Sequence, residues 1–330
     1  MIRRPIARIS GLGVAVPDRV VTNHDFEKTL ETSDQWIVER TGIKERRHAD
    51  SELTLAELAK RASLIALAQA GIGPKDLGAI ILGTATQDRL LPSTACDLQA
   101  LLGADNAAAY DLSAACSGWL YGLTQAEGLI ASGQSEHVLV VGAELLSRIV
   151  DQTDRTTAIL FGDGAGATIV SRATDDGRGL LSTFIRSDGK LAELLWRPSG
   201  GARHPISQKI IDDKSHYIRM AGREVFKSAV LTMAEACDEA LKRAGVTSDQ
   251  IDLLVPHQAN IRIIQATADH AGIPMEKVMI NVDKYGNTSS ASIPLALADA
   301  VAQGKVKKGS LLLLVAFGAG FTWGSTVVRW

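Results

Sequence analysis

A cysteine stands in this chain at a point where a nucleophile is chemically plausible. Cys116 lies among small residues in the stretch 111–121, where a strand-like run changes into a helical one. The unpaired N–H groups at a helix N-terminus stabilise a thiolate, so this position predicts a lowered pKa and a reactive sulfur. The alternative is an inert buried cysteine, the common state of free cysteines. The small neighbours leave room for a substrate, but Cys116 alone does not decide between the two.

Three further segments place polar or flexible groups directly after strand-like runs. They contain His257, Asn287 and the glycine-rich stretch 317–324. Each has a structural alternative, namely a core or capping histidine, a turn or N-cap asparagine, and glycines that only make a turn. With Cys116 they supply a nucleophile, a proton or hydrogen-bond partner, an amide donor and backbone N–H groups for an oxyanion. This combination favours an active site over four unrelated structural roles.

The elements that would position these groups alternate along the chain. Apolar strand-like runs are followed by Ala- and Leu-rich helical stretches, which is typical of a layered α/β fold. We expect strands at 6–17, 78–86, 137–142, 158–170, 179–186, 251–256, 278–282 and 311–316. We expect helices to begin near Thr54, Gly118, Gly222, Ile261 and Ser292.

The two halves of the chain repeat one another. The helix-turn-strand unit 66–82 recurs as 240–256, with Gly71 matching Gly245 and Leu77 matching Ile251, both pairs 174 positions apart. A second, shorter repeat relates residues 131–133 to residues 302–304. We therefore predict a duplicated fold with pseudo-twofold symmetry. Its first half, 1–172, carries the cysteine, and its second half, 173–330, carries the histidine and asparagine. Loops from both halves would meet at the carboxyl ends of strands.

Composition excludes several classes of function. The chain has 330 residues, 46% of them hydrophobic, and a net charge of -2, which indicates neither a nucleic-acid nor a membrane partner. The longest apolar run, 311–321, is about half of the ~20 residues that a membrane helix needs. We also expect no signal peptide.

The sequence motifs likewise argue against a metal site and the common nucleotide cofactors. Cys96, Cys116 and Cys237 show no C-x-x-C spacing, which predicts no metal site and favours a reducing cytoplasm. The glycine pair Gly11 and Gly13 lacks the third glycine of a dinucleotide fingerprint, and there is no Walker A motif, so we expect no cofactor.

Six segments carry a specific resemblance. AACSGWLYGL, FGDGAGA, MAGREVFK, VPHQANIRII, YGNTSSASIPLAL and FGAGFTWGS resemble those of β-ketoacyl-[acyl carrier protein] synthase III, a family of thiolase-fold condensing enzymes. The resemblance runs from the first strand to Trp330. It implies a cytoplasmic homodimer that begins fatty-acid synthesis by condensing an acyl-CoA primer with malonyl-[acyl carrier protein], giving 3-oxoacyl-[acyl carrier protein], CoA and CO2. A condensing enzyme or acyltransferase of secondary metabolism with an unusual or longer acyl donor is the alternative. A non-catalytic partner subunit would not need Cys116, His257 and Asn287 together.

The resemblance also implies roles for individual residues. Cys116 would carry the acyl group, His257 and Asn287 would donate hydrogen bonds to the thioester oxygen, and the backbone N–H groups of Cys116 and Ala319 would form the oxyanion hole. The residues implied to hold CoA and its pantetheine arm are Trp36, Arg40, Arg155, Phe226, Asn260 and Arg262. Indole and guanidinium groups suit an adenine and its phosphates, although a surface ion-pair cluster with Glu39 or Asp154 is an alternative for the arginines.

Three positions depart from the family's pattern. Ala319 replaces a frequent glycine, which matters little because the backbone amide is the group used. Asp269 and His270 replace a basic pair that docks the acidic carrier protein, so docking would depend on a thinner patch of Arg223, Lys227 and Arg262. Leu91 stands where a large aromatic of the dimeric partner closes the acyl pocket, and its smaller side chain predicts a longer or branched primer. The loop 196–216, near that pocket in the family, is also longer than in the shortest relatives.

Overall fold

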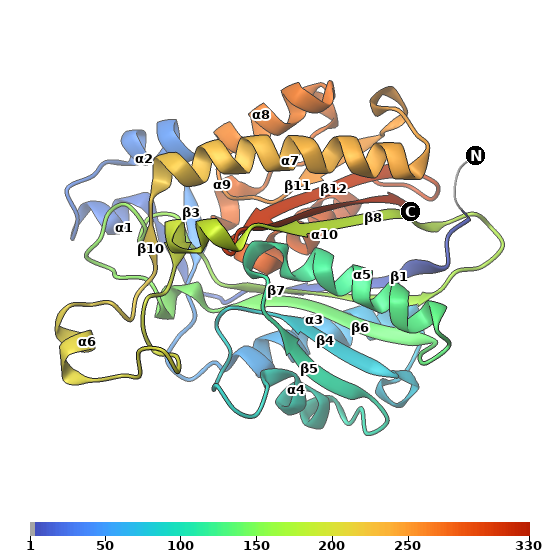
Figure 1. Cartoon of the computed structure of the whole chain (residues 1–330), viewed down its shortest axis with the longest axis horizontal. Coiled ribbons are helices and arrows are strands. Elements are labelled where there is room, and N and C mark those ends of the chain that lie inside the picture. The colour runs from blue at the N-terminus through green and yellow to red at the C-terminus, as the bar shows by residue number, and fades with distance from the viewer. Residues whose placement is uncertain (1–3) are drawn as a thin grey trace.

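The computed structural model describes residues 4–330, in which two β-sheets and three helical layers stack as α/β/α/β/α (Figure 1). The first sheet has the order β1-β7-β6-β4-β5 and the second the order β11-β12-β13-β8. The strands of the first sheet are β1 (Ala7–Ala15), β4 (Ala79–Gly83), β5 (Ala108–Leu112), β6 (His137–Glu144) and β7 (Gly164–Arg172). Those of the second are β8 (Gly179–Ser187), β11 (Leu253–Pro256), β12 (Leu311–Gly318) and β13 (Thr322–Arg329). Two small ribbons pair β2 (Val20–Thr22) with β3 (Glu45–Arg47) and β9 (Leu195–Trp196) with β10 (Arg219–Met220).

Helices cover both sheets and fill the layer between them (Figure 1). The first sheet is covered by α3 (Leu55–Ala70) and α4 (Thr94–Leu102), and the second by α7 (Gly222–Ala244) and α8 (Ile261–Ala271). The middle layer consists of α5 (Gly118–Ala131) and α10 (Ser292–Ala302). The short helices are α1 (Asn23–Glu27), α2 (Asp34–Thr41), α6 (Gln208–Asp212) and α9 (Val282–Tyr285). Both middle helices are rich in buried side chains because each is sandwiched between sheets.

Each middle-layer helix is entered through a strained turn. A 3₁₀ turn of residues 115–117 precedes α5, and another of residues 289–291 precedes α10. Ala115 has φ +46° and Ser289 has φ +49°, a left-handed conformation that costs a residue with a side chain ~1–3 kcal/mol. These two residues are again 174 positions apart, so the duplication extends to the strained turns. Strain of this kind concentrates at functional sites.

The predicted helix starts at Thr54, Gly118, Gly222, Ile261 and Ser292 all coincide with observed helices to within one residue. Two strand predictions are wrong in part. The run 158–170 becomes a strand only at Gly164, because residues 154–160 form hydrogen-bonded turns. The run 278–282 makes a single bridge to Leu254 and then enters α9. An apolar run without alternating polar residues does not distinguish a strand from a turn or the start of a helix.

The glycine-rich stretch 317–324 is the tip of a hairpin, not a loop that follows a strand. Strand β12 continues to Gly318, and β13 returns from Thr322 through a tight turn. β13 was not predicted. The boundary between the halves falls between β7, which ends at Arg172, and β8, which starts at Gly179. The division of the chain into two thiolase-like halves, 1–172 and 173–330, stays a prediction.

Two other predictions concern what the fold lacks. Within residues 4–330, no helix combines the length and the apolar character that crossing a membrane requires. The same residues contain no cluster of three histidine, cysteine or acidic side chains placed to bind a metal ion.

Candidate active site

The turn that holds Cys116 is pressed against the β12–β13 hairpin. The Ser117 hydroxyl donates to the Thr322 carbonyl at 3.1 Å, and the Thr322 hydroxyl donates to the Ala114 carbonyl at 2.8 Å. A Cβ on Gly318 would lie only 2.6 Å from the Cys116 backbone nitrogen. Glycine at position 318 is therefore what allows the hairpin to approach Cys116.

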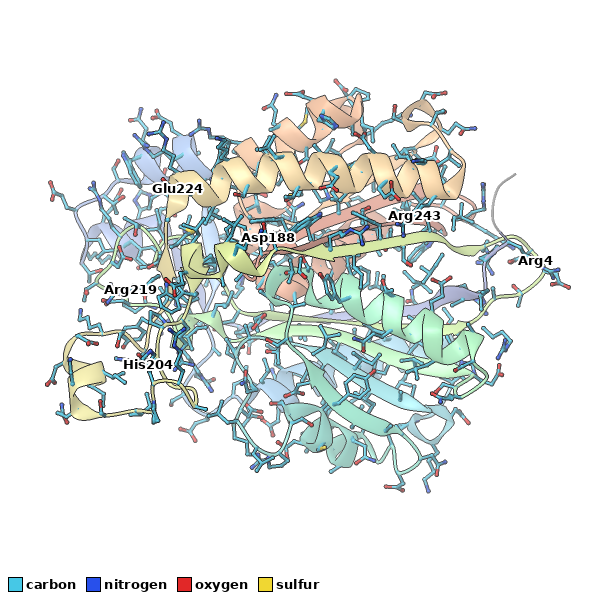
Figure 2. All side chains as sticks on the ribbon, in the orientation of Figure 1. Arg4, Asp188, His204, Arg219, Glu224 and Arg243 are labelled. Carbon is cyan, nitrogen blue, oxygen red and sulfur yellow. The ribbon has the colours of Figure 1, made fainter. Side chains whose placement is uncertain are left out.

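The tip of this hairpin carries the second proposed oxyanion donor. Phe321 and Asp188 exchange two backbone hydrogen bonds of 2.8 Å, which hold the tip against the end of β8 (Asp188 is labelled in Figure 2). Outside the regular elements of residues 4–330, no backbone carbonyl accepts from the N–H of Cys116 or of Ala319. Both groups remain available to an oxygen atom bound at the site.

Burial determines the protonation state of the Cys116 thiol. Loss of hydration raises its pKa to about 12, and the nearby Glu144 carboxyl acts in the same direction. The prediction of a lowered pKa is therefore wrong for this structure, because desolvation outweighs the stabilising groups around the sulfur. A thiol with this raised pKa keeps its proton at neutral pH.

His257 reaches the same place from the end of β11. Its backbone N–H donates to the Val315 carbonyl at 2.8 Å, and its ring nitrogen Nδ1 lies 2.5 Å from the Ser292 hydroxyl oxygen at the start of α10. The residue is 3% exposed, and burial lowers the pKa of the imidazole to about 3. His257 is therefore neutral at pH 7, with one nitrogen engaged by Ser292.

Asn287 is oriented by three hydrogen bonds. Its backbone N–H donates to the Leu160 carbonyl at 2.8 Å, and its carbonyl accepts from Gly162 at 3.0 Å. The side-chain Oδ1 accepts from the Ser289 N–H at 2.9 Å. Since a backbone N–H can only donate, its partner must be the amide oxygen, so the Nδ2 group of Asn287 is free to donate to a ligand.

These three side chains meet in one cavity. Cys116, His257 and Asn287 line it together with Phe226 and Asn260. The rest of its wall is mainly apolar, with Leu160, Leu195, Met220, Val225, Ala229, Met233, Ile263 and Phe317 among the lining residues.

A second apolar cavity also reaches Cys116. Its lining includes Leu146, Ile149, Leu195, Trp196 and Ile218. Cys116 thus lines two cavities, of which only the first is also lined by His257 and Asn287. The arrangement can hold one reactant on each side of Cys116.

The residues predicted to hold CoA form a continuous series leading to the first cavity. The guanidinium groups of Arg40 and Arg155 lie 4.9 Å and 5.3 Å from the centre of the Trp36 ring. Asn260 donates from Nδ2 to the Arg40 carbonyl at 3.0 Å. Arg262 lies 5.4 Å from the Phe226 ring, which lines the cavity.

The alternative of a surface ion-pair cluster does not describe these arginines. Arg155 donates to the Glu31 carbonyl, and the Asp154 carboxylate accepts from Thr156 and Thr157. In the described part of the chain, neither Arg40 nor Arg155 forms an ion pair with Glu39 or Asp154.

The remaining predicted residues lie on the surface. Arg223 and Lys227 are exposed one turn apart on α7, and Arg262 is exposed on α8. His270 is paired with Asp238 at 3.1 Å, so this side of α8 offers no free basic pair. Leu91 is 86% exposed and belongs to neither cavity next to Cys116 in this chain.

Sequence reasoning missed two residues of the site. Ser292 contacts His257, and Ser289 orients Asn287. Gly318, which admits the hairpin, lies within the predicted stretch 317–324. The run of serines between Asn287 and α10 was the only available signal, since hydroxyl groups at a helix start commonly serve as hydrogen-bond partners. Which partner each serine takes depends on the packing of two distant segments.

Comparisons with known proteins agree with this geometry. Profiles of the 3-oxoacyl-[acyl-carrier-protein (ACP)] synthase III family match residues 110–189 and, for its C-terminal part, 241–330. The β-ketoacyl-[acyl-carrier-protein] synthase III of Symbiobacterium thermophilum is 49% identical over 99% of this chain and 98% of its own length.

Two solved structures extend the comparison. The crystal structure of 3-oxoacyl-[acyl-carrier-protein] synthase III from Aquifex aeolicus is 48% identical, with a TM-score of 0.91 over 98% of this chain and 100% of the other. The priming β-ketosynthase from the R1128 polyketide biosynthetic pathway is 35% identical, with the same TM-score over 100% of this chain and 97% of the other. The chain belongs to the β-ketoacyl-[acyl-carrier-protein] synthase III family of thiolase-fold condensing enzymes.

Proposed function

We propose that this chain initiates fatty-acid synthesis by decarboxylative condensation of an acyl-CoA primer with malonyl-[acyl carrier protein], through an acyl group carried on Cys116. The observation that carries the proposal is the position of Cys116 between two apolar cavities, one of which also presents His257 and Asn287. The reaction needs no cofactor, since the CoA thioester is itself a substrate.

In the first half-reaction, Cys116 attacks the thioester carbonyl of acyl-CoA. Because its pKa is raised to about 12, the sulfur releases its proton as the new S–C bond forms, and the departing CoA sulfur takes up a proton. The N–H groups of Cys116 and Ala319 stabilise the oxygen that becomes negative. A preorganised donor of this kind is worth ~10²–10³ in rate.

In the second half-reaction, malonyl-[acyl carrier protein] occupies the first cavity. The bond to its carboxylate breaks, CO2 leaves, and the resulting enolate attacks the acyl carbon on Cys116. The S–C bond to Cys116 then breaks, which releases 3-oxoacyl-[acyl carrier protein], and the Cys116 sulfur takes up a proton from water. Asn287 donates from Nδ2 and His257 from its ring to the thioester oxygen as negative charge develops there. The neutral state of His257 fits a role as hydrogen-bond donor.

The surface residues fit the two thioester substrates. Trp36, flanked by Arg40 and Arg155, suits an adenine with its phosphates, and Asn260, Arg262 and Phe226 continue toward the sulfur as a pantetheine path. The exposed Arg223 and Lys227, with Arg262, are the cations available to an acidic carrier protein.

A homodimer is supported by an exposed apolar pair. Leu90 and Leu91 are 75% and 86% exposed in this chain, and burial against a second copy would remove them from water. In that arrangement Leu91 closes the partner's acyl pocket. We place the enzyme in the cytoplasm, where its three free cysteines would stay reduced.

A condensing enzyme of secondary metabolism is the less favoured function. The polyketide priming ketosynthase shares 35% identity with this chain, against 48–49% for the two synthases III named above.

The test is intact-mass spectrometry after addition of a panel of acyl-CoA primers. Wild-type protein should gain one acyl group located on the Cys116 peptide, and Cys116→Ser should gain none. Cys96→Ser is the matched control, because Cys96 is exposed and lies outside both cavities. An adduct that persists in Cys116→Ser would overturn the nucleophile assignment.

A further inference from the structure

The hydrogen-bond partner of His257 Nδ1 determines what the other ring nitrogen can do. A neutral imidazole carries its proton on only one nitrogen, and the group that contacts the second nitrogen selects the tautomer. That contact is the Ser292 hydroxyl, 2.5 Å from Nδ1. A hydroxyl can donate or accept, so the distance alone does not identify the donor.

The surroundings of Ser292 decide the direction. Ser292 is 1% exposed, and its oxygen also accepts a long hydrogen bond of 3.4 Å from the Gln258 backbone N–H. Within residues 4–330, His257 Nδ1 is the only other hydrogen-bond partner of this hydroxyl. If Nδ1 carried the proton, the Ser292 oxygen would accept twice and its own buried hydrogen would have no partner. Buried donors without partners are costly and rare.

The hydrogen bonds of the neighbouring Gln258 side chain do not change the direction of the bond between Ser292 and His257. The Gln258 side chain donates to the Pro256 and Met279 carbonyls and accepts from the backbone N–H groups of Asn281 and Val282. Its donors and its acceptor are therefore occupied. Unlike many histidines, His257 has no carboxylate or carbonyl among the described residues that would hold a proton on Nδ1.

We infer that Ser292 is a positioning residue that donates its hydroxyl hydrogen to His257 Nδ1 and thereby keeps the proton of the ring on Nε2, facing the cavity. His257 then donates from Nε2 to the malonyl thioester oxygen during decarboxylation. It does not accept the Cys116 proton during acylation. This inference rests on the proposed function, and it assigns Ser292 to the second half-reaction only.

The direct test is the tautomer itself. Nitrogen-15 NMR of protein labelled at its seven histidines distinguishes protonated from bare ring nitrogens, and a His257→Gln variant identifies the His257 resonances. Wild-type His257 should carry its proton on Nε2, and Ser292→Ala should populate both tautomers. A wild-type proton on Nδ1, or an unchanged tautomer in Ser292→Ala, would overturn the inference.

Kinetics of the separate half-reactions supply a second readout. Loss of one hydrogen bond to the ring should slow decarboxylation of malonyl-[acyl carrier protein] by the acylated enzyme roughly tenfold, with acylation of Cys116 changed by about twofold or less. Ser292→Thr keeps the hydroxyl and should restore both the tautomer and decarboxylation. Equal slowing of both half-reactions would mean that Ser292 acts only through general packing.

Ser290→Ala is the matched control. Ser290 is the same residue type, is also 1% exposed and lies two positions away, but its hydroxyl donates to the Gly83 carbonyl at 2.8 Å. Its replacement should leave the His257 tautomer unchanged. Failure of the proposed function would appear separately, as wild-type enzyme that forms no acyl-Cys116. Failure of this inference would appear in enzyme that acylates and condenses normally.

Discussion

Replacement of Gly318 by alanine tests whether the hairpin positions the nucleophile. The added Cβ would lie 2.6 Å from the Cys116 nitrogen, 3.1 Å from its Cβ and 3.2 Å from its Cα. Ordinary contacts begin near 3.4 Å, so the hairpin and the Cys116 turn must separate by about 0.8 Å. None of these atoms is the end of a flexible side chain that could rotate away.

This separation has calculable consequences for rate and stability. A hydrogen bond of ~2.9 Å to an oxyanion would lengthen to about 3.7 Å, beyond useful range. Loss of one oxyanion donor costs ~10²–10³ in rate, or ~2.7–4 kcal/mol. Overpacking at a rigid contact costs a further ~1–3 kcal/mol of folding stability. We therefore expect Gly318→Ala to acylate at least ~100-fold more slowly and to unfold at a lower temperature.

The assay is the single-turnover rate of acyl-enzyme formation, followed by quenched-flow mass spectrometry, with thermal unfolding measured in parallel. Gly128→Ala is the matched control, because a Cβ there meets no atom within 4 Å and Gly128 is exposed within α5, the helix that follows Cys116. It should acylate normally and gain ~0.5–1 kcal/mol of stability. A Gly318→Ala enzyme with wild-type acylation would refute the view that this contact sets the oxyanion geometry.

Two other substitutions separate the remaining parts of the site. Asn287→Ala should still form acyl-Cys116 but should decarboxylate malonyl-[acyl carrier protein] ~10²–10³-fold more slowly, because one donor to the thioester oxygen is lost; wild-type condensation rates would disprove that role. Leu91→Phe should shift the preference between short and longer acyl-CoA primers toward the shorter ones by ~10-fold or more, measured by competition for acyl-enzyme formation, whereas Leu101→Phe, on the exposed side of α4, should not. An unchanged primer profile in Leu91→Phe would remove Leu91 from the acyl pocket.

The sequence predicted five helices well for physical reasons, although it did not predict α4. Thr54 caps α3 by accepting from the Glu57 N–H, and Gly71 and Gly245 end their helices in left-handed conformations, so local residue types mark these boundaries. The apolar run 278–282 lacks such marks, and its pairing depends on Leu254 in a distant strand.

The sequence predicted which residues form the site more completely than it predicted their chemistry. Residue types identified Cys116, His257 and Asn287, and the structure places them in one cavity. The raised pKa of Cys116 could not be predicted, since it depends on how distant segments of the chain pack around the thiol. The contact between Ser292 and His257 joins positions 35 residues apart through tertiary packing alone.

The two repeated turns carry different residues at equivalent positions. Adding the repeat spacing of 174 to Cys116 leads to Ser290, which lies in the second strained turn but is sealed at 1% exposure by its bond to Gly83. Two identical subunits would have had to carry the same residue in both turns. In a single chain the two turns are free to differ. The first turn holds Cys116 beside the cavities, whereas the second holds Ser289, which orients Asn287, and leads into α10, whose Ser292 contacts His257.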